Sequence, residues 1–197
     1  MADNEQKLKT IRNFAQACRY EKGHSEQVTR LAEMLFDALQ VLHGQDRAAR
    51  FLLSCAGILH DIGWANGQKG HHKTSMEMIL EDRTLPLTQD ERTIAALTAR
   101  YHRKSLPKSS HPVYPDLTDA QRKIVDTLAA ILRVADGLDR SHSASVESLC
   151  VTLTEKRIQI HCRTHGPAED ELHYAKVKAD LLEQIFGRTV VFTQELC

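Results

Sequence analysis

Histidine and aspartate residues stand at or near the ends of several predicted helices, and both residue types bind divalent metal ions. The adjacent pair His60-Asp61 closes one such helix just before Gly63, so both side chains can face one pocket. Ligands that are distant in sequence can meet at one centre when each is carried by the end of a helix. The candidate metal ligands are His24, His60, Asp61, His71, His102 and Asp136, with His72 as the alternative to His71.

The mixture of imidazole and carboxylate groups favours one or two ions of a divalent transition metal. Mn, Fe, Co, Ni and Zn accept both ligand types, whereas a site of oxygen atoms alone would suit Mg, so Mg is less favoured. A single histidine is most often an ordinary surface or core residue, and it is the combination at helix ends that favours a metal centre. In this hypothesis one ion is held by His24, His60 and Asp136, a second by His71 and His102, and Asp61 bridges them. Two such ions could activate a water molecule and neutralise the charge of a phosphoryl group, with His60 and Asp61 as the catalytic pair.

Apolar residues spaced three and four positions apart predict the helices that carry the first ligands. One apolar stripe runs from Val28 to Leu39 and starts just after His24, and another runs from Ala49 to Leu59 and ends at His60-Asp61. These two helices would bring His24 and the His-Asp pair to the same region.

Two capping-box sequences mark the starts of further helices. Thr88-x-x-Glu91 opens a helix whose last turn carries His102, and Thr118-x-x-Gln121 opens another. In the latter helix Asp136 follows Leu132 by four residues and therefore lies on the apolar stripe. A carboxylate directed toward a core needs a partner, and a metal ion is one.

The sequence pattern changes near Ser143, where helical spacing gives way to alternation of apolar and polar residues. We therefore expect a mainly α-helical bundle over residues 1–143, followed by a small α+β subdomain over residues 144–197. The elements predicted for this β-β-α-β subdomain are strands over 149–153 and 158–162, an amphipathic helix over 168–186, and a third strand over 189–193.

Four basic residues are candidates for binding substrate phosphate, because Arg offers a bidentate fork and Lys a point charge. Three belong to a proline-containing loop that follows His102 and is expected beside the mouth of the pocket. The candidates are Arg103, Lys104, Lys108 and Arg140.

The composition limits the classes of partner. The 26 basic and 26 acidic residues cancel, so the charge balance gives no strong sign of a nucleic-acid partner. The five cysteines are scattered and predict neither a disulfide framework nor a thiolate zinc site. No apolar run reaches the length of a signal core or a membrane span, so we expect a cytoplasmic protein without a membrane partner. A homodimer is left open.

Several motifs resemble a known superfamily. The run LLSCAGILHDIGW, with His24 upstream and LRVADGLDRSH downstream, is similar to the HD-domain metal-dependent phosphohydrolases. The stretches GHHKTSMEMIL, RYHRKSLPK and LAAILRVADGLDRSH resemble more narrowly the C-terminal HD domain of the exopolyphosphatase and guanosine pentaphosphate phosphatase family. The resemblance runs from about Tyr20 to beyond His142 and implies an HD-type helical bundle. It also implies a primary metal site at His24, His60, Asp61 and Asp136, with His71 and His102 added where a second ion binds.

One departure from that family bears on the expected activity. Its recognised phosphatase chemistry belongs to an N-terminal actin-like domain with glycine-rich phosphate loops, and this sequence contains no such stretch. The expected function is hydrolysis of a phosphate ester or anhydride in a nucleotide or polyphosphate-like substrate by a metal-activated hydroxide. The alternatives are a non-catalytic regulatory module that binds polyphosphate or nucleotide, and an HD-type diiron oxygenase.

Overall fold

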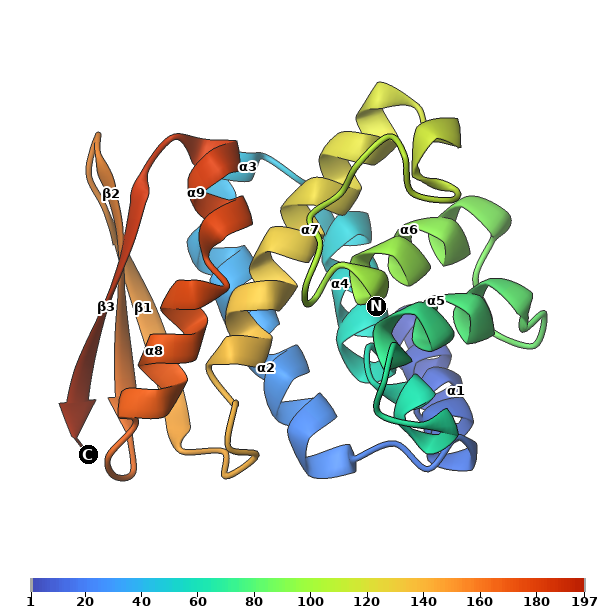
Figure 1. Ribbon diagram of the computed structural model, residues 1–197, viewed down its shortest axis with the longest axis horizontal. Helices are drawn as coiled ribbons and strands as arrows, with labels where there is room; N and C mark the ends of the chain where they lie inside the picture. Colours follow the sequence, from blue (N-terminus) through green and yellow to red (C-terminus); the bar gives the residue numbers. More distant parts are fainter. Residues whose placement is uncertain (1, 197) are drawn as a thin grey trace.

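Helices make up most of the chain before residue 143 in the computed structural model, which describes residues 2–196 (Figure 1). The α-helices of this region are α1 (Ala2–Ala17), α2 (Lys22–Ala38), α3 (Gln40–His43), α4 (Arg47–Leu59), α5 (His71–Glu81), α6 (Gln89–Arg100) and α7 (Asp119–Gly137). Two short 3-10 helices, η1 (Ile62–Asn66) and η2 (Tyr114–Asp116), lie in the connections. None of the described helices is both long and apolar enough to cross a membrane.

The predicted capping boxes are present at the starts of α6 and α7. The Thr88 hydroxyl accepts from the Glu91 backbone N–H at 3.3 Å, and the Glu91 carboxylate accepts from the Thr88 N–H at 2.7 Å. Thr118 and Gln121 make the same reciprocal pair at the start of α7. Each box satisfies two N–H groups that the helix itself leaves unpaired, which fixes where the helix begins.

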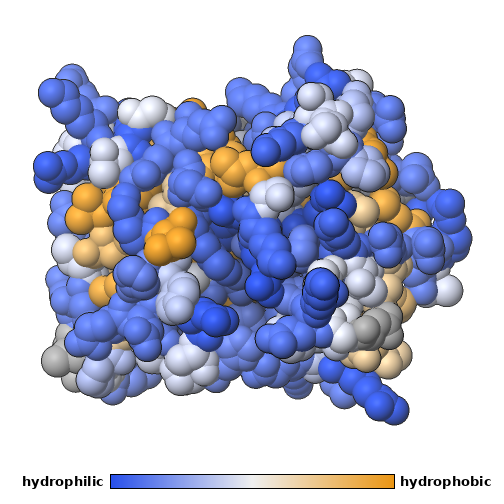
Figure 2. Space-filling view, in the orientation of Figure 1, coloured by the Kyte–Doolittle hydropathy of each residue, from blue (hydrophilic) through white to orange (hydrophobic). Residues whose placement is uncertain are grey.

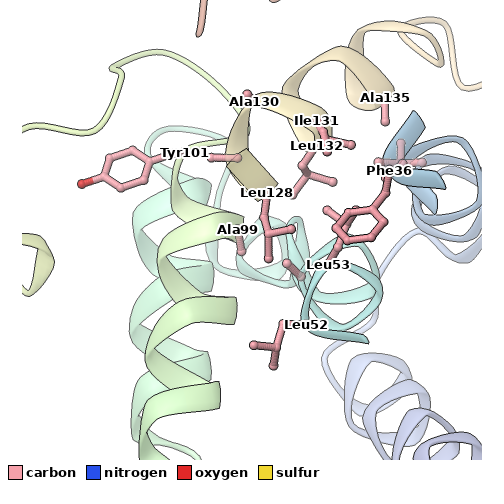
Figure 3. Close-up of a cluster of buried hydrophobic side chains, with 14 of the residues drawn as sticks. Phe36, Leu52, Leu53, Ala99, Tyr101, Leu128, Ala130, Ile131, Leu132 and Ala135 are labelled. Carbon is pink, nitrogen blue, oxygen red and sulfur yellow. The ribbon is translucent and has the colours of Figure 1, made fainter. Parts of the chain in front are cut away.

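The hydrophobic core lies where α2, α4, α6 and α7 meet. Figure 3 shows Phe36 of α2, Leu53 of α4, and Leu128 and Leu132 of α7 converging, with Ala99 of α6 beside them. All are at most 2% exposed. Burial of a side chain such as Leu128 contributes about 1.5–3 kcal/mol, and the small Ala99 lets α6 approach its neighbours closely. This packing fixes the positions of the helix ends that carry the candidate ligands.

A three-stranded sheet and two helices form the C-terminal layer. The strands are β1 (Val146–Leu153), β2 (Arg157–Thr164) and β3 (Thr189–Leu196), in the order β1-β2-β3. β1 and β2 are antiparallel, and β2 and β3 are parallel, joined by a crossover through α8 (Glu169–Val177) and α9 (Asp180–Phe186). Figure 1 shows α8 and α9 between the sheet and α7. The predicted fold class, a helical bundle with a β-β-α-β tail, is confirmed.

Two elements differ from the prediction. No helix was predicted before His24, where the sequence up to Thr10 is polar, yet α1 forms and buries Ile11 and Ala15 completely. The helix expected over 168–186 is broken at Lys178 into α8 and α9. The break coincides with a contact to α7, because Asp180, the first residue of α9, pairs with Arg133.

The bundle and the C-terminal layer share buried surface. β1 packs beside α2, and α8 and α9 pack on α7, so that Val146, Ile158 and Leu182 belong to the same cluster of buried hydrophobic residues as the bundle core. The division into residues 1–143 and 144–197 stays a prediction.

Candidate metal centre

The candidate ligands are delivered to one place by the ends of five helices. The arrangement follows the sequence expectation: each residue lies in the first or last turn of a helix, or directly after it. His24 lies in the first turn of α2, His60 and Asp61 follow α4, His71 begins α5, His102 follows α6, and Asp136 lies in the last turn of α7. All of them are buried, with exposed fractions between 0 and 8%.

His24, His60 and Asp136 form a first triad. The Nε2 atoms of His24 and His60 are 3.4 Å apart, and Asp136 Oδ1 lies 3.3 Å from His24 Nε2 and 3.8 Å from His60 Nε2. Three ligand atoms from two imidazole groups and a carboxylate at these distances could hold one metal ion.

Asp61, His71 and His102 form a second triad. Asp61 Oδ1 lies 3.1 Å from His71 Nε2 and 3.5 Å from His102 Nε2. The other oxygen, Oδ2, faces the first triad at 3.6 Å from His60 Nε2. Asp61 Oδ1 is buried without a hydrogen-bond partner among the described residues, which is costly unless a cation fills the space beside it. The carboxylate is therefore placed between the two triads, as a bridging ligand would be.

Gly63 lets the start of α5 approach the end of α4. A Cβ atom at this position would lie 2.4 Å from the backbone oxygen of His71, so a side chain has no room there. The close approach brings His71 to the Asp61 carboxylate.

The four histidines of the triads are held in one orientation by the ring nitrogen that faces away from the centre. In each, Nδ1–H donates to a fixed acceptor, and Nε2 faces the other candidate ligands. The acceptors are Asp139 Oδ2 for His24 at 2.8 Å, Gly57 O for His60 at 2.7 Å, Gln68 O for His71 at 3.0 Å and Ala99 O for His102 at 2.6 Å.

Burial and charge set the protonation of these groups. Burial lowers the pKa of His60 to about 4 and lowers the pKa of His102 well below its usual value, so both rings are neutral at pH 7. Burial alone would raise the pKa of the Asp61 carboxyl, but the facing histidines, His60 first among them, lower it below its usual range. Neutral imidazoles around an ionised carboxylate are the protonation states that metal binding requires.

His72 lies outside both triads. Its ring is buried, its Nδ1 has no hydrogen-bond partner among the described residues, and burial lowers its pKa to about 4. His71 is the residue whose Nε2 reaches Asp61. The geometry thus favours His71 over His72 as the ligand.

A cavity of about 430 Å³ opens beside the triads. Three of the four basic phosphate-binding candidates, Arg103, Lys104 and Arg140, line it, whereas the side chain of Lys108 is exposed and does not. Arg103 Nη1 donates to His71 Nε2 at 3.1 Å, and the Arg140 guanidinium lies 4.9 Å from the ring centre of Tyr174. The first residues of the loop therefore lie at the mouth of the pocket, as expected.

A family model described as Ppx/GppA phosphatase, domain III, matches residues 7–181 of the chain. The chain belongs to the Ppx/GppA phosphatase family. No curated protein sequence matches it. The resemblance to this family is thus confirmed, whereas membership of the wider HD-domain superfamily stays a prediction.

The Ppx/GppA match runs through α8, and this part of the chain contributes residues that the sequence did not reveal. Lys178 lines the cavity and its Nζ donates to Asp136 Oδ2. Burial lowers the pKa of this lysine to about 7. Lys178 is 42 residues from Asp136, and no local pattern links the two.

Two further residues of this Ppx/GppA family member support His24. Asp139 lies one turn beyond Asp136, and the sequence alone allows three interpretations of it: a partner of a ligand, an ion-pair partner of Arg140, or a helix-end residue. It contacts His24, as a partner of a ligand would. From the sequence His142 is expected to be structural or exposed; it is exposed, and its ring also stacks on that of His24, with centroids 3.8 Å apart, and lines the cavity.

Proposed function

We propose that this Ppx/GppA family member is a metal-dependent phosphohydrolase that cleaves a phosphate ester or anhydride of a nucleotide or polyphosphate-like substrate. The observation that carries the proposal is the shared carboxylate of Asp61, which presents one oxygen to each triad. The triads would hold two ions: His24, His60 and Asp136 the first, His71 and His102 the second, with Asp61 bridging.

The contact between His24 and His60 supports a cation at the first triad. Their Nε2 atoms are 3.4 Å apart, and each ring donates its Nδ1–H to a fixed acceptor, so in the neutral rings that metal binding requires both Nε2 atoms carry lone pairs. Two lone pairs at this distance repel unless a cation lies between them. A divalent transition metal accepts both nitrogens and the Asp136 carboxylate, and when bound it would polarise a phosphoryl oxygen and lower the pKa of a water molecule.

The cavity wall supports a phosphate-containing substrate. Arg103, Lys104 and Arg140 surround the opening with positive charge, and none of them is needed to complete a triad. Guanidinium groups bind phosphate oxygens through parallel hydrogen bonds. These residues would hold the phosphate chain while Asp61 and the histidines fix the position of the reacting phosphoryl group.

The rim of the cavity favours a nucleotide among the phosphate substrates. The face shown in Figure 2 is mostly hydrophilic, with separate hydrophobic patches. Among the described residues, four large hydrophobic side chains are exposed, and three of them, Trp64, Tyr174 and Val177, line this cavity. Trp64 stacks one face on His71 and is 41% exposed, so its ring is available to a base.

The test is metal analysis coupled to a phosphate-release screen. The protein is stripped with a chelator, reloaded with Mn, Fe, Co, Ni or Zn, and supplied with nucleotides and inorganic polyphosphates. We expect two ions per chain, release of phosphate, and loss of about one ion per chain in His102→Ala on the two-metal scheme. His165→Ala, which changes an exposed histidine outside the cavity, serves as the matched control.

Other outcomes of the same screen would contradict the proposal. Ligand binding without phosphate release under any metal would indicate a regulatory module that binds nucleotide or polyphosphate. Oxygen consumption by the iron-loaded protein with an organic substrate would indicate a diiron oxygenase. Unchanged metal content in both His71→Ala and His102→Ala would leave a centre with one ion.

A further inference from the structure

The break between α8 and α9 places a lysine from the C-terminal layer at the candidate metal centre. Lys178 lines the cavity, its side chain is 19% exposed, and its ammonium group binds Asp136. We propose that Lys178 is a substrate-binding residue whose ammonium group holds a phosphate oxygen beside Asp136. The inference rests on the proposed function, because it assigns a further binding residue to the same site.

Close packing of α8 on α7 determines the position of this lysine. A Cβ atom at Gly137 would lie 2.6 Å from the Cα of Ala175, so the two helix backbones meet at a point where no side chain fits. Lys178 follows Ala175 by three residues, about one helical turn, and therefore faces the same side of α8. Asp136 directly precedes Gly137. The contact between Gly137 and Ala175 thus places the Lys178 side chain next to that of Asp136.

A second contact holds the segment on the other side of Lys178. Arg133 is 4% exposed at its side chain and donates to both carboxylate oxygens of Asp180, at 2.9 and 3.0 Å. The same guanidinium donates to the backbone oxygen of Tyr101 at 3.1 Å, next to the ligand His102. Lys178 is therefore fixed between two attachments to α7, which reduces the conformational entropy that ligand binding would otherwise cost.

The hydrogen bonding of Lys178 leaves donors for a ligand. Asp136 uses Oδ1 toward His24 and Oδ2 toward Lys178, so the lysine does not occupy the oxygen that faces the first triad. An ammonium group has three N–H donors, and among the described residues Asp136 is its one hydrogen-bond acceptor. With Arg103 and Arg140 on the same cavity, a phosphate would meet positive charge from the loop, from the end of α7 and from the α8–α9 break.

The test measures binding of inorganic tripolyphosphate to the metal-loaded protein at pH 6.5. Trp64 is the only tryptophan and lines the cavity, so its fluorescence reports occupancy, with calorimetry as a second measurement. Lys178→Met is expected to raise the Kd for tripolyphosphate at least about tenfold, since a charge-assisted hydrogen bond is lost. Lys178→Arg, which keeps the charge, is expected to retain most of the affinity. Lys176→Met is the matched control, because Lys176 lies in the last turn of α8, two residues before Lys178, pairs with Glu183 and does not line the cavity.

The alternative role for Lys178 is to orient Asp136 alone. In that case Lys178→Met would lose metal while its affinity for tripolyphosphate per metal-loaded chain stayed unchanged, and this result would overturn the proposal. Lys178→Gln keeps a donor for Asp136 without the charge, and it carries the same expected loss of affinity should Lys178→Met not fold. The binding measurement needs no turnover and therefore separates the two proposals. If the protein releases no phosphate, the proposed hydrolase is refuted. If Lys178→Met and Lys178→Gln nevertheless bind tripolyphosphate more weakly, the role of Lys178 in binding phosphate is still supported.

Discussion

The helical bundle and the C-terminal layer contribute different things to one site. The bundle supplies both triads. Their side chains are buried, and the Nδ1–H group of each of the four histidines donates to a fixed acceptor. The C-terminal layer supplies none of these ligands but adds Tyr174, Val177 and Lys178 to the wall of the cavity. The part that would hold the metal is thus fixed before any ligand binds, whereas the part that would select the substrate lies nearer to solvent.

The largest expected effect comes from the bridging residue of the bundle. Asp61→Asn keeps the shape of the side chain but removes the charge shared by the two triads. Since metal activation contributes several kcal/mol, turnover is expected to fall at least about a thousandfold, with metal content reduced and the helical circular dichroism signal kept. Asp170→Asn, an exposed change in the C-terminal layer, should leave turnover and metal content unchanged. Full activity in Asp61→Asn would refute the shared centre.

The same contrast explains which features the sequence predicted. The helix ends around His60-Asp61 and the capping boxes at Thr88 and Thr118 depend on residues within a few positions of one another, so local patterns were enough to place them. The meeting of these helix ends depends on the packing of α2, α4, α5, α6 and α7 on one another, which local patterns do not specify.

The cavity wall depends on contacts between residues that are far apart in sequence. Lys178 reaches Asp136 because Gly137 permits a backbone contact with Ala175. A glycine and an alanine so far apart in the sequence do not predict such a contact. The break between α8 and α9 likewise accompanies the pairing of Asp180 with Arg133 rather than a local breaker residue such as proline or glycine. Helix α1 was missed because its apolar residues are few within a polar sequence.

The second prediction tests whether the bundle keeps its buried histidines neutral. Burial lowers the pKa of His60 and His72 to about 4, below the value of about 6.5 in an unfolded chain. Between these values the unfolded state binds more protons, so the free energy of unfolding of the metal-free protein should fall as the pH is lowered from about 6.5 to about 4. His60 alone would contribute about 3 kcal/mol to this loss. The lowered pKa of Asp61 affects the free energy of unfolding only below this pH range.

Chemical denaturation of the metal-free protein between pH 7 and pH 4.5 measures this dependence. His72→Gln removes one buried titrating ring that lies outside both triads, so its stability should fall less steeply over the same range. A flat profile in the unmodified protein would show that these histidines titrate as exposed groups do.

The third prediction concerns the loop at the edge of the bundle. Arg103 lines the cavity and donates to His71, but it is not a member of either triad. Its replacement by alanine should raise KM for an anionic substrate about tenfold and lower kcat less, because a group that binds remote charge stabilises substrate and transition state alike. A fall in kcat without a change in KM would instead place Arg103 at the reacting phosphoryl group.

The smallest expected effect belongs to Lys108. Its replacement tests whether substrate binding depends on the positive charge at the cavity wall or on the positive charge of the loop as a whole. Lys104 and Lys108 are both exposed and lie in the same loop, but Lys104 lines the cavity and Lys108 does not. An exposed charge acts at a distance only through screened Coulomb attraction, and at physiological salt the screening length is about 8 Å. Lys108→Ala should therefore leave KM within about twofold of the unmodified protein at 0.15 M salt, while Arg103→Ala under the same conditions does not. An equal rise of KM in both variants would mean that the substrate extends along the whole loop, and the basic wall would then have to include residues beyond the cavity.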